Sequence, residues 1–237
     1  MRRIAALVII LAALVAGGLL RSSEAASGDV IFLHGWNGSA SSWNTAKAQY
    51  ESAGFTVHVL SLPRAGGSAG DTQVNADYVR AYIASNSLTN VKLVGHSLGG
   101  TLAVYLSLGC SSASTCSGSY APVSSVVMLD SGYGGFGCWL VPDLCSNSTV
   151  MTRIKSFAPT ALPIIDIRSE NEAYPHADCI KVYAGMGHNT FQTDSSVLAD
   201  SIAWPGTNPC AGTPTPTATP TPTPTPCSWW DRLLGRC

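Results

Sequence analysis

The chain alternates short apolar runs with helical segments about once every 30 residues, and this alternation limits its fold more than any other feature. The apolar runs are nearly continuous in valine, isoleucine and leucine, as expected for strands that are covered on both faces of a sheet. Strands and helices that alternate in this way pack as a parallel sheet with helices on both faces. The sequence therefore predicts an α/β fold with about six mainly parallel strands.

The strands are expected at residues 29–35, 55–63, 91–95, 123–130, 162–169 and 179–185. The helices are expected at residues 41–54, 67–86, 98–109 and 193–204. Helical spacing in the second helix is shown by Val74, Tyr78, Tyr82 and Ile83. We expect Asp71 or Thr72 to cap this helix, and Thr193 or Asp194 to cap the last one. The glycine-rich and partly aromatic stretch 131–161 breaks the alternation, and such long loops are often functional.

The two ends of the chain differ in composition from the region between them. Residues 1–25 have a positive start and then an apolar run, which predicts a signal peptide, with a retained membrane anchor as the alternative. Residues 26–211 form the expected folded domain. Alternating threonine and proline at 212–226 predict an extended linker, and residues 227–237 form a tail closed by a disulfide.

The eight cysteines are an even number and predict disulfides formed in an oxidising compartment. Spacing alone does not fix the connectivity. We expect the pattern that joins neighbours: Cys110–Cys116, Cys138–Cys145, Cys179–Cys210 and Cys227–Cys237. Neither C-x-x-C nor H-E-x-x-H occurs, so no metal site is expected. These features together predict a secreted or extracytoplasmic protein, anchored in the membrane if the first segment is retained.

The charge of the chain is nearly balanced. Its net charge is −1 and 11% of its residues are charged, with no basic stripe. Binding to nucleic acid or to an anionic membrane surface is therefore not expected.

Gly95-His96-Ser97-Leu98-Gly99 matches the G-x-S-x-G pattern, directly after an expected strand and directly before an expected helix. A sharp turn at this place forces the serine into a strained backbone region, and glycines leave room for neighbouring backbone. The serine hydroxyl then stands at the carboxyl edge of the sheet, near a helix N-terminus that favours negative charge. The pattern predicts Ser97 as a nucleophile, and the alternative is a tight turn with a solvated serine.

A serine nucleophile needs a base, and the sequence contains five histidines. We choose His188 because it follows the sixth strand, in the chain order serine, acid, histidine. The other four are expected to have other roles: His34 at a strand end, His58 in a strand, His96 beside the serine, and His176 in a loop.

The acid is expected after the fifth strand, where a loop carboxylate can turn back to His188. Glu172 is our choice, with Asp178 and Glu170 as alternatives. Asp166 is expected to lie within the strand. Asp130, at the end of the preceding strand, is a further alternative.

Two backbone amides are expected to bind the oxyanion. One is that of Leu98, the residue after the nucleophile. The other is that of Trp36 in the loop after the first strand, with Asn37 as the second choice.

The segments VIFLHGWNGSASSW, VKLVGHSLGG, IRSENE and YAGMGHNTF together resemble the α/β-hydrolase family, and more narrowly the small secreted bacterial lipases related to the Bacillus minimal lipase. The resemblance implies a minimal α/β-hydrolase fold, Ser97 as nucleophile, His188 as base, Glu172 as acid, and Trp36 and Leu98 as oxyanion donors. The family acid is usually aspartate, so Glu172 departs from the pattern.

These observations predict a secreted serine hydrolase that cleaves carboxylic esters of lipid-like or acyl substrates without a cofactor and works as a monomer. A wall for the acyl group is expected from Phe136, Trp139, Leu140 and Val141. The alternatives are a thioesterase, acyltransferase or peptidase with the same triad. A non-enzyme alternative is a surface binding module whose tail contacts cell wall or polysaccharide through Trp229 and Trp230.

Overall fold

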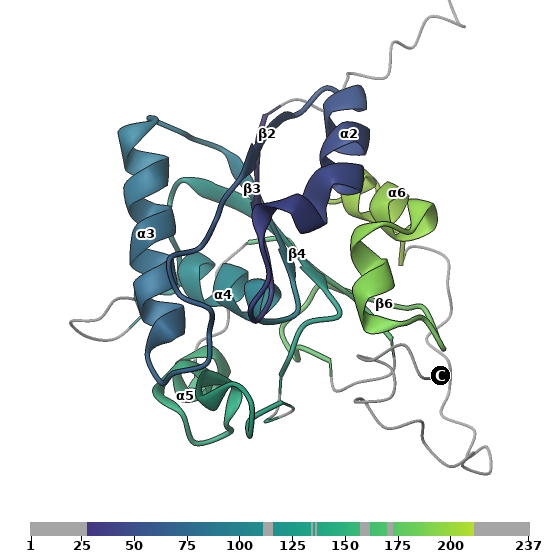
Figure 1. The fold of residues 1–237 in the computed structure, drawn as a ribbon. Coiled ribbons are helices and arrows are strands. Elements are labelled where there is room, and N and C mark those ends of the chain that lie inside the picture. The colour runs from purple at the N-terminus through teal and green to yellow at the C-terminus, as the bar shows by residue number, and fades with distance from the viewer. Residues whose placement is uncertain are drawn as a thin grey trace, which may run out of the picture.

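The computed structural model describes residues 28–110, 116–133, 135, 137–156, 162–169 and 173–210. Its centre is a six-stranded, entirely parallel sheet in the order β2-β1-β3-β4-β5-β6 (Figure 1). The strands are β1 (Asp29–Leu33), β2 (Thr56–Val59), β3 (Val91–His96), β4 (Val123–Leu129), β5 (Ile164–Arg168) and β6 (Cys179–Val182). The expected fold class and all six expected strands are confirmed.

The strand order reverses between β1 and β3. After β1 the chain adds β2 on one side, and it then returns to place β3 on the other side of β1. In a parallel sheet, the loops at the carboxyl ends separate at such a point and leave a crevice. The loops after β1 and β3 therefore meet where a ligand can bind.

Helices cover both faces of the sheet (Figure 1). One face carries α3 (Asp71–Ser85), α4 (Leu98–Ser107) and α5 (Thr149–Ser156), and the other carries α2 (Asn44–Ser52) and α6 (Ser195–Ala203). Every residue of α4 is buried, because this helix packs on β3 and β4 and lies between α3 and α5. This environment explains why the segment is apolar all round rather than amphipathic.

The residues that α3 buries are mostly not the apolar residues whose spacing predicted this helix. Thr72, Asn75, Ala76, Val79 and Ile83 face the core. Val74 and Tyr78 are exposed. The face toward the sheet instead includes the polar side chain of Asn75, which accepts from the Arg64 amide. The helix is confirmed, but its apolar spacing does not mark its buried face.

The cap of α3 also differs from the expectation. The N-cap residue is Gly70, and the amides of Gly70 and Thr72 each donate to the Asp143 carboxylate, both at 2.8 Å. Asp71 accepts instead from loop amides that precede the helix. At α6, by contrast, Asp194 caps as expected and accepts from the amides of Ser196 and Val197.

Asp143 belongs to the stretch after β4, which packs against the end of α3 rather than extending into solvent. This stretch contains a short 3-10 helix, η2 (Pro142–Leu144), and then α5. The Cys138–Cys145 disulfide closes it, and the Ser148 hydroxyl donates to the Asp143 carbonyl at 2.6 Å. The stretch is thus closed on itself by a disulfide and joined to the start of α3 by hydrogen bonds.

On the opposite face, Lys92 of β3 is buried beneath α2 and α6. Its ammonium donates to the carbonyls of Ser201 and Ile202 at the end of α6, both at 3.1 Å, and lies 4.8 Å from the Phe55 ring centre. Burial lowers the pKa of Lys92 to about 7. The carbonyls at a helix C-terminus and the aromatic face are the groups that attract a cation there.

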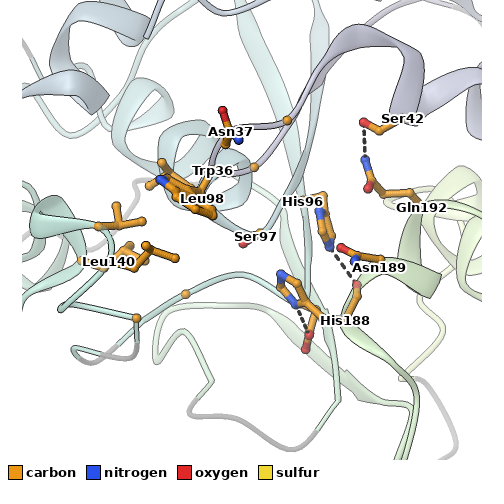
Figure 2. Close-up of a pocket in the computed structure, with 17 residues that line it drawn as sticks. Trp36, Asn37, Ser42, His96, Ser97, Leu98, Leu140, His188, Asn189 and Gln192 are labelled. Atoms are coloured by element: carbon orange, nitrogen blue, oxygen red, sulfur yellow. Dashed lines mark hydrogen bonds and ion pairs between the residues drawn. The ribbon is translucent and has the colours of Figure 1, made fainter. Parts of the chain in front are cut away.

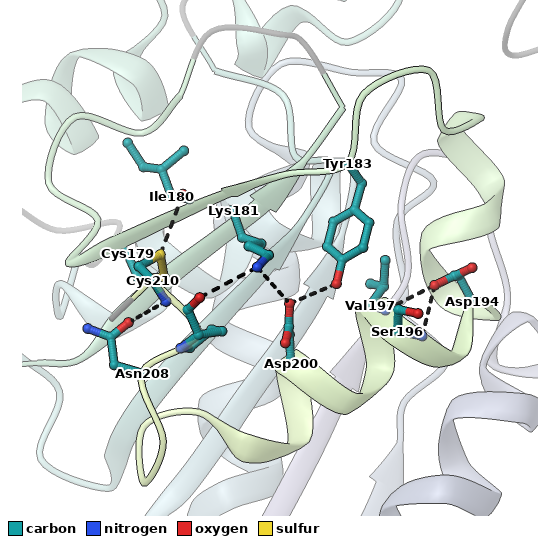
Figure 3. A network of polar contacts seen from close by, with 11 residues as sticks. Cys179, Ile180, Lys181, Tyr183, Asp194, Ser196, Val197, Asp200, Asn208 and Cys210 are labelled. Atoms are coloured by element: carbon teal, nitrogen blue, oxygen red, sulfur yellow. Dashed lines mark hydrogen bonds and ion pairs between the residues drawn. A yellow bond between two sulfur atoms is a disulfide. The ribbon is translucent and has the colours of Figure 1, made fainter. Parts of the chain in front are cut away.

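The edge strand β6 is tied to α6 and to the segment that follows it (Figure 3). Cys179 pairs with Cys210, and the Tyr183 hydroxyl donates to Asp200 of α6 at 2.7 Å. Lys181 lies 3.9 Å from the same carboxylate. These contacts fix both ends of the turn between β6 and α6, which carries η3 (His188–Gln192).

Three of the four expected disulfides are confirmed: Cys110–Cys116, Cys138–Cys145 and Cys179–Cys210. Cys227–Cys237 lies outside the described residues, as do the expected signal peptide, linker and tail. Among the helices of the described ranges, none has the length and apolarity needed to cross a membrane.

Candidate active site

Ser97 occupies a strained turn at the carboxyl edge of the sheet. β3 ends at His96 and α4 begins at Leu98, which leaves a single residue for the change of direction. Ser97 takes φ 56° and ψ −126°, a backbone region that residues other than glycine rarely adopt. Its amide donates to the Leu129 carbonyl of β4 at 2.9 Å, so neighbouring structure holds the turn in place.

The flanking glycines provide the space that the turn needs. A Cβ on Gly95 would come within 2.2 Å of the Gly99 carbonyl oxygen, and one on Gly99 within 2.1 Å of the Leu33 carbonyl oxygen. Gly35, in the loop after β1, has the same role from the other side, since a Cβ there would lie 2.8 Å from Ser97 Cβ. The loop after β1 therefore packs directly against Ser97.

His188 lies in the same pocket as Ser97, on the turn after β6 (Figure 2). Its Nδ1 bonds to Oδ2 of Asp130 at 2.6 Å, and both side chains are buried. The other carboxylate oxygen of Asp130 accepts from the amide and the hydroxyl of Ser169, at 2.8 and 2.7 Å. Burial raises the pKa of Asp130, but the hydrogen bonds and charge interaction from His188 and the Ser169 bonds outweigh it, so the pKa lies below its usual value.

The carboxylate on His188 thus differs from the expected one. Glu172 and Glu170 lie outside the described residues, and the exposed Asp178 accepts from the Ile164 amide at the start of β5. Asp130 reaches His188 because β4 lies directly beside β3 and because its positive φ of 44° ends the strand in a sharp turn. Among the described residues, the carboxylate bonded to His188 therefore lies at the end of β4, the further alternative, and we take Asp130 as the candidate acid in place of one in the loop after β5.

Asp166 stays within β5, as expected. It forms a buried ion pair with Arg168 at 2.6 Å and accepts from the Tyr174 amide at 2.8 Å. This pair lies in the strand next to the one that ends in Asp130.

His96, the neighbour of Ser97, positions the turn that carries His188. Its Nε2 donates to the His188 carbonyl at 2.8 Å, and the two rings lie 4.5 Å apart (Figure 2). Burial, together with the charge of His188, lowers the pKa of His96 to about 3. His96 is therefore neutral at physiological pH, and it adds no positive charge beside His188.

His34 also has a positioning role. Its Nε2 accepts from the Leu62 amide at 3.1 Å, so Nδ1 carries the proton that is donated to the Gly35 carbonyl at 2.9 Å. These two bonds join the loop after β1 to the segment after β2. His58 bonds to Tyr82 and Asp29, and His176 packs on Tyr174, so neither contacts Ser97.

Trp36 and Leu98 both line the pocket beside Ser97. Among the described residues, the backbone amide of neither has a hydrogen-bond acceptor. The amide of Asn37, the second choice, is used, because it donates to the Ala65 carbonyl at 2.9 Å. The Trp36 and Leu98 amides therefore remain the candidate donors to an anionic oxygen near Ser97.

The pocket has a volume of about 360 Å³. One wall is apolar and comes from the stretch after β4, with Leu140, Val141 and Leu144. Leu140 and Val141 were expected there, and Leu144 was missed. Trp139 does not line the pocket and is 61% exposed, whereas Phe136 lies outside the described residues.

The opposite wall is polar and was not anticipated. It comes from the segment after β1, where Ser42 lies in a short 3-10 helix, and from η3, with Asn189 and Gln192 (Figure 2). The only available sequence signal was the position of Asn189 and Gln192, one and four residues after His188, on the same helical turn. Within the described residues, no group of histidine, cysteine, aspartate and glutamate side chains could hold a metal ion.

Comparisons with known proteins agree with this architecture. A model of the alpha/beta hydrolase family matches residues 30–234 of the 237-residue chain. The chain is similar to the pimeloyl-acyl-carrier protein methyl ester esterase of Salmonella heidelberg, with 32% identity over 79 residues. This match covers 33% of the chain and 30% of that enzyme, so the chain spans less than a third of the curated relative.

Two solved structures share the fold at low identity. A monoacylglycerol lipase from Paleococcus ferrophilus gives a TM-score of 0.56 at 12% identity, over 75% of this chain and 93% of that one. An esterase from Exiguobacterium antarcticum gives a TM-score of 0.51 at 15% identity, over 74% of this chain and 90% of that one. At these identities the likeness shows the fold alone.

Proposed function

Because the chain belongs to the alpha/beta hydrolase family, we propose that it is a secreted serine hydrolase that cleaves carboxylic esters through an acyl-enzyme on Ser97. The expected family is confirmed, and the narrower resemblance to minimal bacterial lipases stays a prediction. The observation that carries the proposal is the buried 2.6 Å bond between His188 Nδ1 and Asp130, in the pocket that Ser97 enters from its strained turn.

In the proposed reaction, Ser97 Oγ attacks the ester carbonyl while His188 Nε2 takes its proton. The Trp36 and Leu98 amides bind the oxyanion that forms. His188 then gives the proton to the leaving alcohol as the acyl-enzyme forms. Water, deprotonated by the same imidazole, attacks the acyl-enzyme. As the bond to Ser97 Oγ breaks, His188 returns that proton to Oγ, and the carboxylic acid is released.

Asp130 has an electrostatic and orienting role in this proposal. Its carboxylate accepts the Nδ1 proton of His188, so Nε2 carries no proton and can act as the base. The depressed pKa of Asp130 keeps the carboxylate charged, and that charge stabilises the imidazolium. His96 supports the same step, because it fixes the His188 backbone and remains neutral.

Two further observations support the ester chemistry and the exported location. The Salmonella heidelberg relative is named as a methyl ester esterase. Three disulfides join neighbouring cysteines, and disulfides persist in oxidising compartments outside the cytoplasm.

The nucleophile is tested with a fluorophosphonate probe, which reacts with activated serines. We expect wild-type protein and the matched variant Ser131→Ala to be labelled, and Ser97→Ala to be unlabelled. Ser131 is buried on the same edge of the sheet, which makes it a suitable control. Labelling that persists in Ser97→Ala contradicts the nucleophile assignment.

The class of substrate is tested with matched ester, thioester and amide compounds that share one acyl group. We expect Ser97-dependent turnover to be fastest with the ester. A faster thioester or amide reaction assigns the enzyme to the thioesterases or peptidases instead.

The terminal segments are proposed as a signal peptide, a linker and a small tail. The tail is proposed to contact polysaccharide. Pull-down on cell wall or polysaccharide, with and without residues 212–237, tests that contact. Equal recovery of both forms contradicts a binding role for the tail.

A further inference from the structure

We infer that the enzyme selects esters of a small alcohol that bears a further hydroxyl group, with a short apolar acyl group, and that Gln192 recognises the alcohol. This inference rests on the proposed function. It is carried by the division of the pocket into a polar wall beside His188 and an apolar wall on the other side of Ser97 (Figure 2).

The reaction determines which wall meets which half of the ester. His188 must give a proton to the leaving oxygen, so the alcohol lies on the side of the His188 ring. The carbonyl oxygen faces the Trp36 and Leu98 amides. The acyl chain therefore extends away from His188, toward the remaining wall.

The residues on the His188 side are polar. Asn189 and Gln192 come from η3, directly after His188, and Ser42 comes from the 3-10 helix η1 (Ala40–Trp43) that follows β1. Gln192 is 6% exposed, which is unusual for an uncharged polar side chain unless it is bound or faces a polar pocket. Its position places a carboxamide beside the leaving group.

The hydrogen bonds of Ser42 determine which end of that carboxamide faces the pocket. The Ser42 hydroxyl donates its proton to the Ser39 carbonyl at 2.8 Å. Ser42 Oγ can then only accept, so Gln192 Nε2 is the donor in the 3.0 Å bond between them. The Gln192 oxygen, which accepts no hydrogen bond from the described residues, is thereby held as an acceptor for a ligand.

An acceptor fixed in the pocket, such as Gln192 Oε1, favours substrates that carry a hydrogen-bond donor at that place. A hydroxyl on the alcohol half of the ester can donate to Gln192 Oε1, whereas a methyl group at the same place would leave that oxygen unpaired. Asn189 is exposed at the mouth of the pocket and offers both a donor and an acceptor. The polar wall thus favours hydroxylated alcohols over alkyl alcohols of the same size.

The acyl wall is small and fixed. Leu140, Val141 and Leu144 lie on the stretch that the Cys138–Cys145 disulfide closes and that Asp143 joins to α3. The whole pocket, at about 360 Å³, lies near the lower end of the range for small-molecule sites. A wall held in this way accepts a short acyl group and gives little room for a long one.

The test compares 2-hydroxyethyl butyrate with propyl butyrate, which differ by a hydroxyl in place of a methyl group. Turnover is followed by titration of the released butyric acid, and each kcat/KM is divided by the rate of alkaline hydrolysis of that ester. We expect wild-type enzyme to prefer the hydroxyethyl ester by about 3- to 10-fold, the effect of one hydrogen bond. Equal values, with both reactions dependent on Ser97, overturn the inference and leave the proposed function intact.

Gln192→Met keeps the length of the side chain and removes the acceptor. We expect it to lower the ratio of the two kcat/KM values to about one, whereas the matched variant Gln49→Met on α2 keeps the wild-type ratio. Loss of both activities in equal proportion at Gln192→Met means a structural role and overturns the assignment of Gln192. Absence of Ser97-dependent hydrolysis of either ester overturns the proposed function, and the inference with it.

The acyl half is tested with hydroxyethyl esters of acetate, butyrate and octanoate. We expect kcat/KM to be highest for acetate or butyrate and to fall at least about tenfold for octanoate, because the chain exceeds the fixed wall. A maximum at octanoate overturns the short-acyl part of the inference.

Discussion

Replacement of Asp130 by asparagine tests the corrected triad, because the surrounding hydrogen bonds fix how the new side chain must lie. One Asp130 oxygen accepts from both the amide and the hydroxyl of Ser169, and the other bonds to His188 Nδ1. In Asp130→Asn, only the carboxamide oxygen can accept the two Ser169 bonds. The NH2 group must therefore face His188 and donate to Nδ1.

This arrangement gives the imidazole the wrong tautomer. When Nδ1 accepts a hydrogen bond, the ring proton is on Nε2, so Nε2 cannot take the proton of Ser97. The reactive tautomer would place two N–H groups against each other in a buried site, and the imidazolium would lose its charged partner. We expect kcat to fall about 10⁴-fold, which corresponds to about 5.5 kcal/mol in the activation free energy.

The assay is steady-state hydrolysis of p-nitrophenyl butyrate, together with the rate of fluorophosphonate labelling. Thermal unfolding of the variant is measured in parallel, and a transition within a few degrees of the wild type shows that the fold is kept. Glu172→Gln is the matched variant for the acid expected from the sequence, and we expect it to retain activity within about threefold.

The result that would refute the reasoning is an Asp130→Asn enzyme within about tenfold of the wild type. A loss of 10³-fold or more in Glu172→Gln, with Asp130→Asn active and folded, would restore the acid after β5. Loss of folding in Asp130→Asn would contradict the claim that asparagine preserves the Ser169 bonds.

Two predictions concern stability. Asp143→Ala removes the acceptor of the Gly70 and Thr72 amides, and we expect it to lower the free energy of unfolding by about 1–2 kcal/mol in urea titration. The control Asp77→Ala, on the exposed side of α3, is expected to lower it by less than about 0.5 kcal/mol. Equal effects of the two substitutions would contradict the capping role of Asp143. Lys92 has a folded pKa of about 7, below its value of 10.5 in the unfolded chain, so from pH 7 to pH 10 the unfolded state binds more protons and stability rises with pH. Relative to Lys92→Met, which does not titrate, we expect the wild type to gain roughly 3 kcal/mol over that interval, and a constant difference between the two proteins would contradict a buried amine with a depressed pKa.

Local patterns predicted the features that depend on neighbours in the sequence. The apolar runs gave all six strands, and the glycines around Ser97 gave the strained turn, because both depend on a few consecutive residues. Three disulfides were predicted from proximity along the chain. Asp194 was predicted as a cap because its partners are two and three residues away.

Features that depend on distant segments were missed. The α3 cap comes from Asp143, more than 70 residues further along the chain, and no local pattern links the two. Val74 and Tyr78 are exposed because the sheet and the neighbouring loops, not the apolarity of α3 itself, determine which face is buried. Gln192 gained its candidate role only when η3 packed beside Ser42.

The acid of the proposed triad shows most clearly which features the sequence determined and which the tertiary structure decided. The sequence by itself determined that a serine on a strained turn and a histidine after the last strand would meet at one edge of a parallel sheet, because alternation of strands and helices places every such loop at that edge. It also placed candidate carboxylates after two neighbouring strands, β4 and β5, at the same edge. Only the tertiary structure decided between the strands, because the sharp turn at Asp130 and its bonds to Ser169 direct that carboxylate to within 2.6 Å of His188.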